Sequence, residues 1–213
     1  MNRIIKWVIS IGLTLFLIMF FAQVLTSRSY MTLSKGLYAS HAKITYDHVF
    51  VAHQLIDYLN YRHDDLTFGA TPDDSETVMR DIEIRHMVDV KDLYTMLRLV
   101  ALGALAVALG GLALLRRQDK TLMWRALRDS YRLPLVFTGV MGVIFLTNFN
   151  RAFVLFHELF FDNDDWILRG DDVLIQLLPQ NFWFVSALLI LLGLALSNIL
   201  LAFISHKQLK KLV

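Results

Sequence analysis

The chain has 213 residues, of which 56% are hydrophobic and 19% are charged, and its formal net charge is +2. Such an apolar composition excludes an intrinsically disordered chain and argues against an ordinary soluble domain, because too little polar sequence remains to cover a core. The sequence contains no cysteine, which excludes disulfides, thiolate metal sites and a cysteine nucleophile.

Four apolar runs are each long enough to cross a bilayer as a helix, which takes about 20 mostly apolar residues. They are Ile4–Thr26, Leu93–Leu115, Leu133–Phe156 and Asn181–Ser205. The first run has the basic start of a signal peptide, but its apolar core is longer than usual and no small-residue cleavage site follows, so we expect a retained helix. The sequence predicts an all-α polytopic membrane protein with four transmembrane helices, forming a single membrane domain over residues 1–213.

The segment between the first two runs, residues 27–92, is predicted to be an extracytoplasmic helical insertion. From Tyr46 to Tyr61, apolar residues recur at helical spacing on one face, which indicates a helix that either packs as a cap on the spans or lies in the lipid headgroup layer. The stretch Phe68–Pro72 breaks this helix. We expect Asp73–Ser75 to cap the next helix, which continues into the second span. Residues 157–180 form a second, shorter extracytoplasmic loop.

The segments outside the four apolar runs are alternately basic and acidic along the chain. Lysine and arginine gather before the first run, between the second and third, and after the fourth, whereas residues 27–92 and 157–180 are acidic. An excess of lysine and arginine marks the cytoplasmic side of a membrane. We therefore expect a multi-pass protein with both termini in the cytoplasm and both acidic segments outside.

Two histidines from distant parts of the sequence fall at the same predicted membrane face. His86 lies just before the second run, and His157 directly follows the third. Asp89 lies three residues after His86, on the same helix face, where a carboxylate can fix the imidazole tautomer. Taken alone, His86 and Asp89 are better explained by an interfacial histidine with a local hydrogen bond than by a catalytic pair. Two imidazoles that converge at a lipid–water boundary, however, indicate a catalytic site.

Polar residues interrupt the apolar sequence near the outer end of the third run, namely Asn148, Asn150 and Arg151. Polar groups at such a depth are costly unless they line a polar cavity or pair with each other, so they are candidates for substrate or oxyanion contacts. Snorkelling towards the headgroups also explains Arg151. Trp166 follows an acidic turn and is expected to anchor it at the interface, beside the substrate. Four histidines with irregular spacing are explained by a solvated face: His41, His48, His53 and His63.

Two short motifs resemble hallmarks of the bacterial lipoprotein intramolecular transacylase family. They are Glu83–Lys91, which contains His86, and Phe156–Phe161, which contains His157 and is followed by Asn163, Asp165-Trp166 and Leu177–Pro179. The order of four spans with a large first outer segment is also similar to the family. One departure is Arg169-Gly170, where a proline-containing turn is expected.

The resemblance implies transfer of the sn-2 acyl chain of an S-diacylglyceryl cysteine onto the α-amine of the same lipoprotein N-terminus, which gives the lyso-form. It implies no cofactor and no metal. The partners it implies are a diacylated lipoprotein and membrane lipid in a bacterial cell membrane, with no nucleic acid. In this interpretation His86, oriented by Asp89, and His157 act as a general base and a general acid, in either order.

Two other hypotheses fit the residues alone. The chain could be a non-enzymatic membrane assembly factor or pH sensor, with His86 and His157 as its switch. It could also be a membrane zinc hydrolase, since His86, Asp89 and His157 offer three ligands and leave a position open for water, although no HExxH motif exists.

Overall fold

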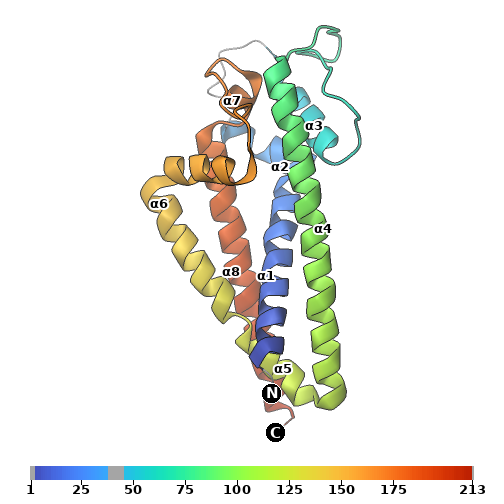
Figure 1. Cartoon of the computed structure of the whole chain (residues 1–213), viewed down its shortest axis with the longest axis vertical. Helices are drawn as coiled ribbons and strands as arrows, with labels where there is room; N and C mark the ends of the chain where they lie inside the picture. Colours follow the sequence, from blue (N-terminus) through green and yellow to red (C-terminus); the bar gives the residue numbers. More distant parts are fainter. Residues whose placement is uncertain (1–2, 38–45, 213) are drawn as a thin grey trace. The chain divides into compact units, whose positions relative to one another are not determined.

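The computed structural model describes residues 3–37 and 46–212, so His41 lies outside the described residues. Within them the protein is all-helical, with 78% helix and no strand (Figure 1). The helices are α1 (Arg3–Leu25), α2 (Arg28–Leu33), η1 (Lys35–Leu37), α3 (His48–Leu59), α4 (Asp81–Gln118), α5 (Lys120–Asp129), α6 (Arg132–Phe160), α7 (Val173–Leu177) and α8 (Gln180–Lys210).

Four helical stretches are long and apolar enough to cross a membrane, and they contain the four predicted runs. These stretches are Arg3–Leu25, Asp81–Gln118, Lys120–Phe160 and Gln180–Lys210. The prediction of an all-α chain with four candidate spans is therefore confirmed. At 1.5 Å per residue the 38 residues of α4 extend over about 57 Å, almost twice the hydrocarbon core of a bilayer. The charged first turns of α4, before Leu93, consequently lie outside the apolar stretch.

The chain divides into two compact units. Unit 1 comprises Met1–Ala22, Leu97–Thr147 and Leu188–Val213, and unit 2 comprises Gln23–Met96 and Asn148–Ala187. Both predicted outer segments, 27–92 and 157–180, fall entirely within unit 2. The same unit also holds the first four turns of α4 and the last part of α6.

In unit 1, α1 packs closely against both α4 and α8 (Figure 1). A Cβ atom at Gly12 would lie 2.5 Å from the carbonyl oxygen of Ala104 and 2.9 Å from the Cβ of Ala108. One at Gly193 would lie 2.6 Å from the ring of Phe21. Small residues allow such close approach between helices in lipid. Ala104 and Ala108 thus belong to a packing surface between helices.

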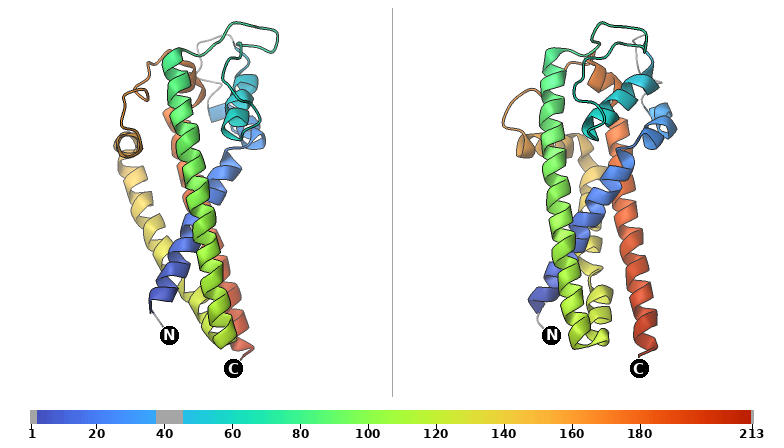
Figure 2. Two further views of the ribbon diagram at one scale, coloured as in Figure 1. Left: turned by 45° about the vertical axis from the view of Figure 1, so that its right-hand side comes forward. Right: turned by 90° about the vertical axis from the view of Figure 1, so that its right-hand side faces the viewer.

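Helix α5 joins the neighbouring ends of α4 and α6 (Figure 2). Asp119 begins it as an N-cap, with its carboxylate accepting a hydrogen bond from the N–H of Thr121 at 2.8 Å. Ala126 is buried against Ile9 and Leu115. Because α5 is short and basic, the hydropathy pattern gives no sign of it.

The predicted helix over Tyr46–Tyr61 is α3, in unit 2. Its buried face, which includes Val51 and Leu55, packs in one core with Leu174 and Leu177 of α7. Because protein covers this face, the structure favours the cap alternative over a helix that lies in the headgroup layer.

The expected start of the next helix at Asp73–Ser75 is wrong, because α4 begins at Asp81. The buried carboxylate of Glu83 provides the cap, with one oxygen accepting from the N–H of Arg80 at 2.9 Å. Its other oxygen accepts from the N–H of Leu174, at the start of α7, at 2.8 Å. Burial raises the pKa of this carboxyl, and the two backbone hydrogen bonds partly oppose that rise. One side chain therefore holds the first turns of α4 and α7 together.

Gly12→Ala should destabilise the protein by about 1 to 3 kcal/mol, because the new methyl group would collide with the backbone of Ala104. Gly110→Ala is the matched control, since a Cβ there meets nothing within 4 Å, and it should be neutral or stabilising by up to about 1 kcal/mol. Thermal unfolding of the purified chain in detergent measures both. Equal melting temperatures for the two variants would contradict the close packing of α1 on α4.

Glu83→Ala should cost about 2 to 4 kcal/mol, because it orphans the N–H groups of Arg80 and Leu174. Glu83→Gln keeps one acceptor oxygen and should cost about half as much. Amide hydrogen exchange at residues 80 and 174 provides the readout. Unchanged protection of both amides in Glu83→Ala would refute the shared cap.

Candidate active site

Two helices of unit 2 bring His86 and His157 together. His86 lies in the second turn of α4 and His157 in the last turn of α6, and their ring centroids are 5.9 Å apart, with the ring planes inclined at 34°. The two residues are only 8% and 9% exposed, respectively. Residues 71 positions apart in the sequence thus form one buried imidazole pair.

The part of α6 that carries His157 begins at Asn148. This residue has a non-helical backbone (φ −157°, ψ 72°), and its side-chain oxygen accepts a hydrogen bond from the N–H of Arg151 at 3.0 Å. Asn148 therefore acts as an N-cap inside α6. Asn150 and Arg151 are exposed, and within the described residues no side-chain hydrogen bond or ion pair ties either to the imidazole pair. A role for these three residues in substrate binding stays a prediction.

The loop that follows α6 is fastened to the first turns of α4. Arg85 makes a bidentate ion pair with Asp165, with nitrogen–oxygen distances of 2.8 and 2.9 Å. One turn further along α4, Asp89 accepts a hydrogen bond from the side-chain amide of Asn163 at 2.9 Å. These two contacts hold the end of α6 beside α4 and so set the separation of the two histidines.

Aromatic rings surround the imidazole pair. Phe161 meets His86 edge-on at 5.2 Å between centroids, and Trp166 lies 5.0 Å from His157. Phe153, one turn before His157, is nearer still at 4.3 Å. Trp166 is thus placed beside a candidate catalytic residue, and the rings together form an apolar wall.

The hydrogen bond expected between Asp89 and His86 is absent from the described residues. The Nδ1 atom of His86 is buried and has no hydrogen-bond partner there, while one oxygen of Asp89 is engaged by Asn163. Asp89 acts on His86 through its charge alone, which favours the imidazolium. The orienting role predicted for Asp89 therefore has no hydrogen bond to support it.

The tautomer of His157 is set by its own helix. Its Nδ1 lies 2.7 Å from the carbonyl oxygen of Phe153. Because a carbonyl only accepts, Nδ1 must carry the hydrogen and donate it. The lone pair of neutral His157 is consequently on Nε2, which is the nitrogen that can take up a proton.

Both histidines lie outside the apolar runs, and both are held neutral at pH 7. Burial, and then the charge of His157, lowers the pKa of His86 to about 4, against an opposing effect of Asp89 and Asp165. Burial also lowers the pKa of His157, and its hydrogen bond to Phe153 partly offsets this. Since a charge on one ring disfavours a charge on the other, the pair accommodates one proton at a time.

The donor set required by the zinc hypothesis is not assembled. Among the residues that the structure describes, no three histidine or carboxylate side chains converge so as to hold a metal ion. In particular, His86, Asp89 and His157 do not form such a group.

Two contributors to the site are missed by the sequence patterns. Asp165 belongs to the acidic turn before Trp166, and in the structure it pairs with Arg85. Asn163 carries no charge or motif that would single it out. The only available signal is that each lies in a hallmark motif or directly after one.

Comparison with known proteins assigns the chain to a family. A model of the family described as lipoprotein intramolecular transacylase Lit matches residues 3–183. An uncharacterised protein of Aquifex aeolicus (strain VF5) is 33% identical over 123 residues, which cover 58% of this chain and 54% of that protein. The chain thus spans about half the length of that curated relative.

Solved structures share the fold. The membrane-integral lipoprotein intramolecular transacylase Lit from Bacillus cereus superposes with a TM-score of 0.80 at 24% identity, over 98% of this chain and 96% of that one. A variant of the same Bacillus protein, in which a histidine is replaced by arginine, gives a TM-score of 0.76 at 24% identity, over 98% and 92% of the two chains. These similarities establish a multi-pass membrane fold. Because the family model covers most of the sequence, the chain belongs to the lipoprotein intramolecular transacylase family.

Proposed function

We propose that this protein moves the sn-2 acyl chain of an S-diacylglyceryl cysteine onto the α-amine of the same lipoprotein N-terminus. The observation that carries the proposal is the buried imidazole pair, with ring centroids 5.9 Å apart, in a chain of this family. The solved relative from Bacillus cereus is named a lipoprotein intramolecular transacylase. The substrate is a diacylated lipoprotein, and no cofactor is required.

The reaction is a rearrangement within one molecule. The amine nitrogen attacks the ester carbonyl, an N–C bond forms, and the bond from the carbonyl carbon to the glycerol oxygen breaks. One proton moves from the nitrogen to that oxygen, so nothing is consumed or released. Holding the amine and the ester in one substrate supplies proximity.

A neutral imidazole pair suits this proton transfer. As the N–C bond forms, the attacking nitrogen becomes cationic and strongly acidic, and a neutral histidine can accept its proton. The protonated ring, or its neighbour, then protonates the departing oxygen. For His157 the acceptor is Nε2, because Nδ1 is bonded to Phe153. Either histidine can act as the base.

The aromatic wall supports transfer over hydrolysis. His86 and His157 are almost completely buried, and Phe161 and Trp166 pack on them. Excluding water from the reacting ester prevents release of a free fatty acid. Trp166 is placed to border the substrate, and we retain Asn148, Asn150 and Arg151 as candidates for substrate or oxyanion contacts.

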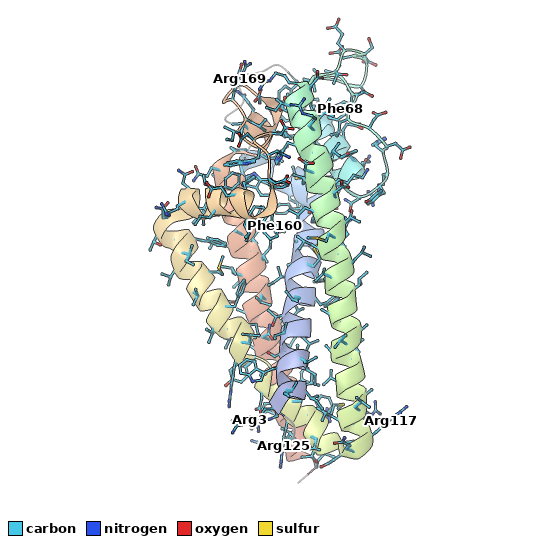
Figure 3. All side chains as sticks on the ribbon, in the orientation of Figure 1. Arg3, Phe68, Arg117, Arg125, Phe160 and Arg169 are labelled. Carbon is cyan, nitrogen blue, oxygen red and sulfur yellow. The ribbon has the colours of Figure 1, made fainter. Side chains whose placement is uncertain are left out.

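We also propose that the site faces the outside of a bacterial cell membrane and that both termini are cytoplasmic. Arg3, Arg117 and Arg125 lie at the same end of unit 1 (Figure 3), and lysine and arginine concentrate on the cytoplasmic side of membrane proteins. Membrane lipid is the remaining partner.

The pH-sensor alternative receives less support. A sensor that works near neutral pH needs a group that titrates there, whereas the pKa of His86 is lowered to about 4. Its low pKa instead fits a group that remains a neutral base at physiological pH.

His86→Ala and His157→Ala should each lower N-acylation of a reporter lipoprotein by at least about 100-fold, because each removes a proton carrier. Substrate and product are isomers of equal mass, so tandem mass spectrometry must locate the acyl chain on the amine. His206→Ala, which changes an exposed histidine at the end of α8, is the control. Normal N-acylation by either test variant would remove that histidine from the mechanism.

The transfer rate should fall about tenfold per pH unit between pH 7 and pH 5, in step with the neutral fraction of an amine whose pKa is near 8. His86 adds no further loss in this range, because burial lowers its pKa to about 4 and it stays neutral. Initial rates on a synthetic diacylglyceryl peptide, at subsaturating concentration, give the slope. A steeper fall, approaching a hundredfold per unit below pH 6.5, would mean that a histidine also titrates within this range.

A further inference from the structure

A groove of about 460 Å³ lies beside the imidazole pair within unit 2. One side is formed by a stripe along α4 and the other by the end of α6 with the residues that follow it. We refer to it as the acidic groove, and it is lined by Asp89, Asp92, Leu93, Met96, Leu159, Phe160, Phe161, Asp162 and Asn163.

The acidic groove is polar at one end and apolar at the other. Along α4, Asp89 and Asp92 precede Leu93 and Met96 on the same helix face, since residues three and four apart are neighbours. Carboxylates thus give way to aliphatic side chains in the direction of the apolar run. Such a lining matches a ligand that has a polar head and a hydrocarbon chain.

The negative charge of the groove is not neutralised by the protein. The carboxylates of Asp89, Asp92 and Asp162 form no ion pair with any residue in the described part of the chain. Two cations on the same part of α4 are engaged elsewhere. Lys91 lies over the ring of Tyr58, 3.8 Å from its centroid, and Arg85 pairs with Asp165. The head of a matching ligand is therefore cationic.

The groove shares a wall with the imidazole pair. Phe161 lines the groove and also packs on His86 and His157, at 5.2 and 5.7 Å between centroids. Asp89 lies one helical turn from His86, whose buried Nδ1 has no partner within the described residues. A ligand head at the carboxylates is consequently within a short movement of the histidines.

We propose that the acidic groove binds the lipid-modified amino terminus of the substrate in its ammonium form, with a hydrocarbon chain along Leu93 and Met96. This inference rests on the proposed function. An α-amine with a pKa near 8 is mostly protonated at pH 7, so carboxylates recognise the form that prevails in solution. Because the carboxylates stabilise the ammonium, the groove is a docking subsite and not the place of reaction. The amine leaves the groove and loses its proton before it attacks the ester. Asp89 thereby acts on the substrate instead of orienting His86.

Another ammonium-bearing lipid fits less well. Phosphatidylethanolamine carries a phosphate next to its ammonium, and three uncompensated carboxylates would repel that phosphate. A lipoprotein amino terminus has no phosphate at this point. Charge therefore favours the lipidated peptide as the occupant.

The test measures binding separately from turnover. The ligand is a dialkyl-ether glyceryl cysteinyl peptide with a free α-amine, which cannot react because it has no ester, and its N-acetylated form is the matched control. Calorimetry on the full chain in phosphatidylcholine nanodiscs should show about tenfold tighter binding of the free amine.

Asp92→Asn and Asp162→Asn should each weaken binding of the free amine about fivefold and leave binding of the N-acetyl form unchanged. Asp64→Asn, an exposed acid outside the groove, should change neither.

Each outcome separates the groove from the reaction. The groove proposal is overturned if the two ligands bind with equal affinity, or if neither groove substitution changes the affinity for the free amine. In that case N-acylation of the ester substrate is assayed, which judges the proposed function on its own. Failure of the wild-type chain to convert the ester substrate overturns the proposed function, even if the amine preference is found. Competition by phosphatidylethanolamine as strong as that of the free-amine peptide would reassign the groove to a lipid headgroup.

Discussion

Burial of two imidazoles that share the aromatic neighbour Phe161 makes any charge on them expensive, and this constraint governs the site. Desolvation keeps both His86 and His157 neutral, and the charge of His157 adds to this effect at His86. The pair is therefore ready to receive a proton but poorly able to store one. Aromatic neighbours cover the two rings, and the polar contacts lie around the edge of the pair. Two contacts hold the end of α6 beside α4: the ion pair of Arg85 with Asp165 and the hydrogen bond from Asn163 to Asp89. Neither contact involves the imidazole rings.

The acidic residues of unit 2 do several different jobs. Glu83 is a buried cap for two helices, and Asp165 forms the ion pair with Arg85 that holds the end of α6 beside α4. Asp92 lines the acidic groove and has no ion-pair partner in the described part of the chain. In the sequence they are indistinguishable members of two acidic segments. Only their partners distinguish a structural carboxylate from one that is available to a ligand. A carboxylate that is already paired or hydrogen-bonded attracts a ligand cation only weakly.

Hydropathy and helical periodicity predicted the four long helices and α3, because both signals are local. The convergence of His86 and His157 also followed, since the number of spans determines which residues share a membrane face. The start of α4 could not be predicted, because it depends on Glu83 and on a bond to Leu174 that lies 91 residues away. The partner of Asp89 was misjudged for a similar reason. The carboxylate had a plausible neighbour one turn away, and a distant amide engaged it instead.

The hydrogen bond from His157 to the carbonyl of Phe153 has a consequence for how this site tolerates change. Many enzymes set the direction of a working histidine with an acidic side chain, which a single codon change can delete. Here the acceptor is part of the main chain, so no replacement at position 153 that keeps the helix removes it. Drift in the surrounding sequence can alter the wall around the ring, while the nitrogen that faces the chemistry stays the same.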